Sequence, residues 1–378
     1  MTHGSIIGYD INAKMCQISY YNEKTQEPET VDTGIEKENN QIPLVMNYYK
    51  ETWTYGRQAR RMSTVRDSIC VEGIWECALG NRKIEVDGQE YEGVQLLADF
   101  VKYTLNGFEE IESITFTVPE KNEDIRVLLK GIGQKLGVAK ENIYVQDYKE
   151  SFCHYMFNQP KELWQYEAAL FYCDEDVIRA YMLRELKNSS QKSRESFVTV
   201  DKVADARMEE LEAVYPVLHV EKAKAADEHF KRFIQSVFNK KMISSVFLTG
   251  DGFENNWYPN SLRVLCNGRR AFMGNNLYSK GACYTAQRRK VGVQALVVII
   301  GALAFRMLGV FVCLLGTRLK RKERLFVMMA YTPKATVQAA IGGIPLALGF
   351  ACGDTVLTVA VLAIVLTAPL GAFAIDFS

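Results

Sequence analysis

Residues 8–14, near the amino terminus, combine residue types that can hold a metal ion and a phosphate group. Asp10 stands at the end of an apolar run, where a carboxylate can bind a hydrated magnesium ion. Asn12 and Lys14 follow in the turn, and turn amides together with a lysine can bind phosphate. A β-hairpin with a polar turn and no ligand explains the same residues, so both interpretations stay open at this point.

A second candidate site is the turn formed by Gly250, Asp251 and Gly252, which follows the apolar run 245–248. Glycine has no Cβ, so the backbone at this turn can approach a flat ligand closely. The alternative is an ordinary turn from a strand into a helix.

The cysteines and histidines predict neither a disulfide framework nor a metal site. The nine cysteines are odd in number and irregularly spaced, without a CxxC pair, which is typical of reduced thiols in a cytosolic chain. The amino terminus lacks the apolar core of a signal peptide. We assign no role to the four histidines, His3, His154, His219 and His229.

The candidate turns need a framework of strands and helices to position them. Short apolar runs predict strands at 5–9, 15–21, 114–118, 143–145, 168–172 and 245–248. Apolar residues at helical spacing predict helices over 124–136 and 225–240. Strands alternating with helices indicate an α/β fold.

The charge balance divides the chain into two unlike parts. Overall, 45 basic and 45 acidic residues cancel, and 48% of residues are hydrophobic, which excludes a disordered chain and a strongly basic nucleic-acid binder. We therefore expect no nucleic-acid partner. Residues 291–378 hold seven basic and three acidic residues, a net charge of +4, so the first 290 residues carry −4.

The carboxy-terminal part predicts about three transmembrane helices, over 291–317, 325–350 and 354–375. Each is apolar over roughly the 20 residues that a bilayer requires, so membrane lipid is an expected partner. Arg306 lies inside the first span and should face a partner or an aqueous cavity. Pro333 and the Gly342-Gly343 pair interrupt the second, a pattern typical of transporter binding sites. A simple kink with a snorkelling Lys334 is the alternative.

Six segments in order resemble the actin/Hsp70 ATPase superfamily, over about residues 4–287. They are 6–10 (IIGYD), 41–45 with 53–59 (QIPLV and WTYGRQA), 114–119 (ITFTVP), 145–151 (VQDYKES), 246–252 (VFLTGDG) and 275–282 (NNLYSKGA). The resemblance is closest to a divergent bacterial branch. It implies a two-lobed α/β domain with ATP and magnesium as cofactors. It also implies that Asp10 binds metal, that Asn12 and Lys14 lie near phosphate, and that Gly250–Gly252 backs the adenine.

The departures from this family concern the phosphate loops. Asn12-Ala13-Lys14 replaces the family's Gly-Thr-Thr, and residues 172–179 read YCDEDVIR where a glycine-rich loop is expected. Asp174, Glu175 and Asp176 would repel a triphosphate unless a metal intervened. We therefore expect a relative that does not hydrolyse ATP, although Asp10 keeps hydrolysis open.

Residues 291–376 resemble the carboxy-terminal end of bacterial sodium/proton antiporters of the cation:proton antiporter family. The resemblance rests on 322–326 (KERLF), 331–343 (YTPKATVQAAIGG), 356–364 (VLTVAVLAI) and 367–371 (TAPLG). It implies that the ion path is lined by Arg306, Pro333, Lys334, Thr336 and Gln338. The acidic pair that binds the ion in this family lies on an earlier helix, which has no counterpart in this chain.

The two parts prefer opposite orientations in a membrane. The basic loop 318–324 favours the inside, and one span before it would put the amino-terminal domain outside. That domain has free cysteines, and the basic residues 288–290 beside it also favour the inside. A frustrated topology, a re-entrant first segment and an artefactual join near residues 287–291 are the alternatives.

The sequence thus predicts an actin/Hsp70-like domain over 1–287 and an antiporter-like transmembrane region over 291–378. The first functional hypothesis is a nucleotide-binding or pseudo-ATPase module, attached to the inner or plasma membrane with its soluble domain in the cytoplasm. The second is a cation:proton antiporter component that works only with a complementing partner. The third is a membrane-anchored interaction protein whose protein partner is unknown.

Overall fold

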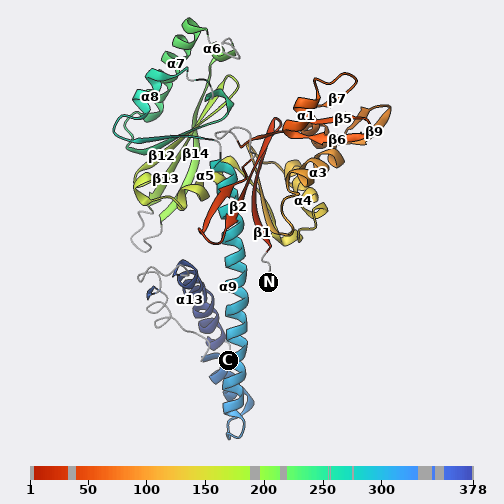
Figure 1. Ribbon diagram of the computed structural model, residues 1–378. Coiled ribbons are helices and arrows are strands. Elements are labelled where there is room, and N and C mark those ends of the chain that lie inside the picture. Colours follow the sequence, from red (N-terminus) through yellow and green to blue (C-terminus); the bar gives the residue numbers. More distant parts are fainter. Residues whose placement is uncertain are drawn as a thin grey trace. The chain divides into compact units, whose positions relative to one another are not determined.

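The computed structural model describes residues 4–32, 40–187, 196–212, 219–253, 255, 257–274, 276–330, 343–344 and 353–376. The chain divides into two compact units, Met1–Ala286 and Gln287–Ser378 (Figure 1). This division lies beside the domain boundary that the sequence predicts.

The first unit contains one sheet built mainly from the amino-terminal half. Its strands are β1 (Ser5–Ile11), β2 (Met15–Asn22), β3 (Glu27–Thr30), β10 (Ile111–Val118) and β11 (Ile143–Asp147), in the order β11-β10-β1-β2-β3, with β4 (Ile42–Pro43) also paired to β2. Strands β1, β2 and β3 are antiparallel neighbours, whereas β10 and β11 join the other side in parallel.

A second sheet repeats this arrangement later in the chain. Its strands are β12 (Glu167–Asp174), β13 (Val177–Lys187), β14 (Ser196–Arg207), β15 (Ile243–Thr249) and β16 (Arg270–Met273), in the order β14-β13-β12-β15-β16. Again the first three strands are antiparallel neighbours and the last two are parallel. The hairpins β1–β2 and β12–β13 therefore occupy equivalent places in the two sheets.

Helices and smaller strands complete the first unit (Figure 1). The helices are α1 (Gly56–Met62), α2 (Ile74–Leu79), α3 (Gly93–Thr104), α4 (Glu123–Lys135), α5 (Tyr148–Phe157), α6 (Glu209–Glu212), α7 (Val220–Phe238) and α8 (Pro259–Leu265). The smaller strands are β5 (Met46–Tyr49), β6 (Thr52–Tyr55) and β7 (Ile69–Val71), which form one sheet, and β8 (Lys83–Val86) with β9 (Gln89–Glu92).

Helices α4 and α5 each begin where a side chain satisfies a free backbone amide. Asn122 caps α4 by accepting a 2.8 Å hydrogen bond from the Ile125 amide. Asp147 and Glu150 form a reciprocal capping box at the start of α5, which satisfies two amides that a helix leaves unpaired. The end of β11 is thereby held next to the first turn of α5.

Each large sheet has its own apolar core. Tyr9, Phe116 and Leu129 lie in the core of the first sheet, and Phe171 and Phe230 lie in that of the second. All the strands and both helices that the sequence predicts in this unit are confirmed, as β1, β2, β10, β11, β12, β15, α4 and α7.

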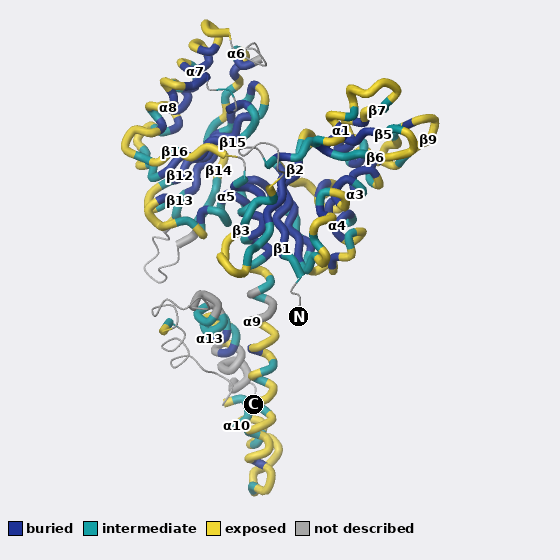
Figure 2. Tube along the Cα trace, in the orientation of Figure 1, coloured by how far each residue is buried: buried dark blue, intermediate teal, exposed yellow. Residues whose placement is uncertain are grey.

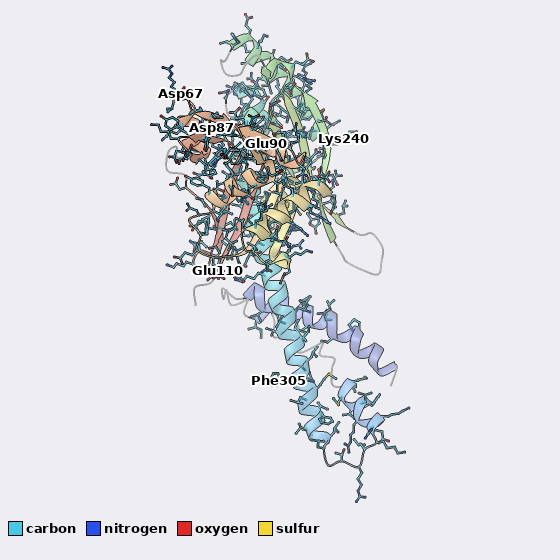
Figure 3. All side chains as sticks on the ribbon, turned by 90° about the vertical axis from the view of Figure 1, so that its right-hand side faces the viewer. Asp67, Asp87, Glu90, Glu110, Lys240 and Phe305 are labelled. Carbon is cyan, nitrogen blue, oxygen red and sulfur yellow. The ribbon has the colours of Figure 1, made fainter. Side chains whose placement is uncertain are left out.

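The second unit is helical where it is described, with α10 (Arg321–Ala330), α13 (Gly353–Asp376) and most of α9 (Leu277–Leu314). Among the described residues, one helical segment is long and apolar enough to cross a membrane, Leu296–Leu314, with a mean hydropathy of 2.5. Only 6% of it is buried, as the exposed stretch of α9 in Figure 2 shows. Phe305, labelled in Figure 3, is 79% exposed.

The predicted boundaries in this unit need two corrections. Helix α9 begins at Leu277, well before the first predicted span. The predicted basic loop 318–324 is helical from Arg321, because Glu323 accepts a 2.8 Å hydrogen bond from the Lys320 amide and caps α10. The third predicted span coincides with α13 as a helix. Most of the second predicted span lies outside the described residues.

Candidate functional site

The turn of the β1–β2 hairpin is closed by the side chain of Asn12. Asn12 Oδ1 accepts hydrogen bonds from the backbone amides of Lys14 at 2.8 Å and Met15 at 3.0 Å. This side-chain turn fixes the chain direction after β1. The Asn12 oxygen is thus occupied within the turn, and its amide nitrogen lies 3.4 Å from the Tyr148 hydroxyl.

Lys14 joins the two equivalent hairpins. Its Nζ lies 3.0 Å from Asp174 Oδ1 and 2.9 Å from Glu175 Oε1, in the turn between β12 and β13. Neighbouring carboxylates raise the pKa of Lys14 against the opposing effect of burial. Lys14 was predicted to bind phosphate, and Asp174 and Glu175 were predicted to repel a triphosphate. In the structure, Lys14 binds these two carboxylates instead.

Asp10 is fully buried at the end of β1. Among the described residues, neither of its carboxylate oxygens has a hydrogen-bond partner of good geometry. Burial, with a smaller contribution from Asp251, raises its pKa from 3.8 to about 8, although the Tyr148 hydroxyl acts in the opposite direction. Asp10 is therefore protonated and uncharged at neutral pH.

The donor set around Asp10 does not fit a magnesium site well. Magnesium takes near-octahedral oxygen ligands and is usually held by ionised carboxylates together with phosphate. Asp10 is protonated at neutral pH, and no group of three candidate ligands among the described residues could hold a metal ion. Magnesium at Asp10 stays a prediction from the sequence.

Gly250 and Gly252 are required by contacts within the protein. Gly250 has a φ of +96°, and a Cβ there would lie 2.1 Å from the Cys173 carbonyl oxygen. A Cβ on Gly252 would lie 2.0 Å from Cys173 Sγ. The turn after β15 thus packs directly against the end of β12, and the Trp257 indole donates to the Gly252 carbonyl at 2.8 Å.

A cavity of about 290 Å³ lies where the two hairpins and the turn after β15 meet. Its lining includes five aromatic, three acidic and two basic side chains. They are Trp75, Tyr148, Tyr172, Tyr181 and Tyr278, then Glu120, Asp174 and Asp251, and finally Lys14 and Arg179. The structure brings Asn12, Lys14, Gly250 and Asp251 of the predicted site together in this lining, whereas Asp10 is buried and Gly252 packs on Cys173.

Three tyrosines form a cluster beside this cavity. The rings of Tyr148 and Tyr278 are stacked, with centroids 3.7 Å apart and an angle of 8° between planes. Tyr172 meets Tyr148 edge-on at 5.4 Å, and Tyr278 bonds Thr249 Oγ1 at 2.7 Å. Burial raises the pKa of all three tyrosine hydroxyls, and the nearby Asp10 contributes in the same direction when it is ionised.

A larger and more open cavity of about 780 Å³ adjoins the same turn. Lys14 and Asp251 line both cavities. Its other charged residues are Arg57, Arg60, Arg61, Glu72 and Glu76. This second cavity therefore carries charges of both signs.

The tyrosine cluster was not singled out by the sequence. Tyr148, Tyr172 and Tyr278 lie within segments that carry the superfamily resemblance or its departures, but tyrosine has no role in those motifs. They come from α5, β12 and α9, and tertiary packing of these elements brings their rings together. No local sequence pattern indicates that these three tyrosines lie together, and only the structure shows it.

Of the predicted ion path, Arg306 lies in α9 and is partly exposed. Pro333, Lys334, Thr336 and Gln338 lie outside the described residues. The ion path therefore stays a prediction from the sequence.

Residues 27–299 match the family described as "Family of unknown function (DUF5716) C-terminal". The chain belongs to this family. The match begins at β3, after the β1–β2 hairpin, covers the whole second sheet, and ends within α9, after the start of the apolar segment Leu296–Leu314.

Part of the chain is also similar to sodium/hydrogen exchangers. Sodium/hydrogen exchanger 9B2 of Mus musculus is 43% identical over 84 residues, which is 20% of this chain and 15% of that protein. Sodium/hydrogen exchanger 9B1 of Mus musculus is 42% identical over 85 residues, 20% of this chain and 14% of that protein. Sodium/hydrogen exchanger 9B2 of Xenopus tropicalis is 40% identical over 96 residues, which is 23% of this chain and 18% of that protein.

The chain therefore spans about a seventh of the length of the mouse exchangers. Together with the apolar segment Leu296–Leu314 of α9, this partial similarity indicates an association with a membrane. The bacterial origin implied by the antiporter resemblance stays a prediction, because these relatives are vertebrate proteins.

Proposed function

We propose that this chain is a membrane-attached pseudo-ATPase, with an actin/Hsp70-like domain whose cleft does not hydrolyse ATP. The repeated strand order of the two large sheets supports a duplicated, two-lobed domain of this kind. The convergence of both hairpins and the turn after β15 on one cavity supports a ligand site between the lobes.

One observation carries the proposal that ATP is not hydrolysed. Lys14 is held by Asp174 and Glu175, so the cation that would meet phosphate is already neutralised. Asp10 is protonated at neutral pH and cannot serve as an anionic metal ligand without losing its proton. A triphosphate would therefore meet carboxylates at the second hairpin.

Calorimetry on the full chain in detergent micelles tests this proposal. We expect no phosphate release from ATP with magnesium and no saturable binding at micromolar ATP. Saturable micromolar ATP binding that Asp10→Ala abolishes, without phosphate release, would show a pseudo-ATPase that still binds nucleotide. Measurable phosphate release lost in the same variant would show that the protein is an ATPase.

We further propose that the domain lies on the cytoplasmic side of a cell membrane. Arg288, Arg289 and Lys290 precede the apolar segment of α9, and basic residues near a span favour the cytoplasm. The basic residues at 318–324 also favour the cytoplasm but lie at the other end of the same span, so they favour the opposite orientation. Labelling of Cys266, which is exposed in the first unit, by a membrane-impermeant maleimide in whole cells and in lysed cells gives the orientation.

The second candidate function is a component of a cation:proton antiporter. The 40–43% identity to sodium/hydrogen exchangers favours it, but the chain corresponds to only 15% of the mouse 9B2 protein. We expect no sodium-dependent proton flux in vesicles that contain this chain alone. Flux that appears only after co-reconstitution with a second protein would support complementation, and an interaction role remains if both functions fail.

The join between the two parts also has a direct test. The family match runs through residues 287–291 to 299, and α9 crosses these residues as one helix. Both observations favour a genuine continuous chain at 287–291 over an artefactual join there. A reading frame interrupted across these codons in genomic DNA would overturn that conclusion.

A further inference from the structure

A dense cluster of basic residues follows the apolar segment of α9. Residues 318–324 (RLKRKER) contain five basic side chains and one acidic side chain, a net charge of +4 in seven positions. The cluster begins shortly after the end of the apolar segment Leu296–Leu314. This segment is long enough to cross a bilayer, so the cluster lies at the level of the lipid headgroups when it does.

Two hydrogen bonds hold the cluster and leave most of its charges at the surface. Glu323, the acidic side chain of this stretch, accepts a 2.8 Å hydrogen bond from the Lys320 amide at the start of α10. The Arg324 guanidinium donates to the Thr317 carbonyl at 2.7 Å. The other four basic side chains are exposed, namely Arg318, Lys320, Arg321 and Lys322. The loop is thus folded with four cations on its outside.

Exposed apolar side chains stand next to these cations. In α10, Leu325 and Phe326 are each 45% exposed. Each lies one helical turn after a basic residue, Arg321 or Lys322, and residues at this spacing share one side of a helix. One side of α10 therefore presents positive charge and then apolar surface, which matches the boundary between lipid phosphates and acyl chains.

We propose that residues 318–326 form a binding surface for anionic phospholipids, with the basic side chains on the lipid phosphates and with Leu325 and Phe326 against the acyl chains. Each basic residue beside a membrane helix strengthens the attraction to anionic lipid roughly fivefold. This inference rests on the membrane attachment in the proposed function and adds the class of lipid. A soluble phosphate compound carries the same charge, so the test compares both sources.

Phosphatidylglycerol is the anionic probe, and phosphatidylcholine is the control without net charge. The full chain in neutral detergent micelles is titrated with each lipid and followed by thermophoresis. Half-saturation should require at least about tenfold less phosphatidylglycerol than phosphatidylcholine. The preference should decrease as salt rises, because salt screens exposed charges. Equal half-saturation with the two lipids would overturn the proposal.

Glycerol 3-phosphate is the soluble form of the same headgroup chemistry. Without acyl chains it cannot use the apolar side chains, and at millimolar concentration it should not displace phosphatidylglycerol. Displacement at the concentration at which the lipid itself binds would assign the cluster to a soluble phosphate compound and overturn the lipid proposal.

Two triple variants test the position of the charges. Replacing three exposed cations of the cluster together, by Arg318→Gln, Lys320→Gln and Lys322→Gln, should weaken phosphatidylglycerol binding at least about tenfold. The control triple removes the same charge from exposed lysines of the first unit, by Lys24→Gln, Lys102→Gln and Lys222→Gln. It should leave the binding unchanged. Equal losses in the two triples would show that overall charge attracts the lipid, which would overturn the assignment to this surface.

A single variant tests the apolar part of the surface. Phe326→Ser should weaken phosphatidylglycerol binding about fivefold by removing an apolar contact, and it should leave the salt dependence unchanged. The basic triple variant should instead reduce the salt dependence. Unchanged lipid binding in Phe326→Ser would overturn the contact between this side chain and acyl chains.

Flotation after reconstitution separates this inference from the proposed membrane attachment. The apolar segment should carry the full chain into vesicles of phosphatidylcholine and of phosphatidylglycerol alike. Flotation with both vesicles, but without a lipid preference in the titration, would overturn the inference alone and leave the membrane-attached pseudo-ATPase standing. Failure to float with either vesicle would overturn the attachment and, with it, the lipid surface.

Discussion

The hairpins β1–β2 and β12–β13 hold equivalent places in two sheets of the same strand order, yet they differ in chemistry. The first presents Asn12 and Lys14 and keeps the buried Asp10 without a partner among the described residues. The second presents Asp174 and Glu175, and its buried Asp176 accepts a 2.6 Å hydrogen bond from Arg207. The two hairpins thus share a backbone arrangement, but the turn of the first is basic and the turn of the second is acidic.

This difference explains why the two hairpins contact each other. Two turns that both offered backbone amides and glycines would leave a space suited to phosphate. A lysine on one side and two carboxylates on the other instead attract each other. Lys14 and Asp174 both remain in the lining of the cavity of about 290 Å³.

The largest expected effect comes from the glycine turn that supports the second hairpin. Gly250→Ala should destabilise the folded protein by at least about 3 kcal/mol, because a Cβ would lie 2.1 Å from the Cys173 carbonyl oxygen. Gly268→Ala is the control, since it also has a positive φ but has no atom within 4 Å of a Cβ. It should lose only about 1 kcal/mol. Chemical denaturation gives both values, and equal losses would contradict the packing explanation.

The next effect concerns the buried carboxylate of the first hairpin. The folded pKa of Asp10 is about 8, against an ordinary value of 3.8. Between these values the folded protein keeps a proton that the unfolded chain has released. Its stability should therefore fall as the pH rises from about 4 to about 8, by a few kcal/mol in all.

Asp10→Asn should remove most of this pH dependence, because the amide cannot ionise. Thermal melting of both proteins at pH 5 and pH 8 measures the difference, and Asp67→Asn serves as the exposed control. A variant that loses as much stability as the parent between these two pH values would show that another group is responsible.

The sequence predicted the strands and turns of this site better than their chemistry. Short apolar runs located β1, β10 and β15, because most residues of these strands are buried, on both faces of the sheet. The repeated sheet order could not be predicted from local patterns, since β1 pairs with β10 about a hundred residues further along. Tyr148, Tyr172 and Tyr278 come from α5, β12 and α9, so their cluster also depends on tertiary packing and appeared only in the structure.

The interpretation of individual residues also changed. The glycines at 250 and 252 suggested close approach to a ligand, but their nearest neighbour is Cys173. Lys14 suggested phosphate, but its partner lies 160 residues away in the chain. In both cases the residue type was informative about close or charged contacts, and its partner depended on tertiary structure.

A smaller effect is expected at the buried aspartate of the second hairpin. Asp176→Asn should cost about 1–2 kcal/mol, because Asp176 is only 7% exposed and loses a charged hydrogen bond to Arg207. Asp205→Asn, which breaks an exposed ion pair with Lys202, should change the stability by less than about 0.5 kcal/mol. Urea denaturation compares the two, and indistinguishable losses would show that Asp176 is not held by Arg207 in solution.

The smallest expected effect on stability comes from the contact between the hairpins. Lys14 and Asp174 are 45% and 40% exposed, so water screens their attraction. A double-mutant cycle with Lys14→Met and Asp174→Asn should give a coupling below about 1 kcal/mol, decreasing with salt. A coupling above about 2 kcal/mol would instead mean that the ion pair clamps the two sheets together. A small coupling would mean that the opposite charges of the two hairpins contribute little to folding, as expected for an ion pair that water screens.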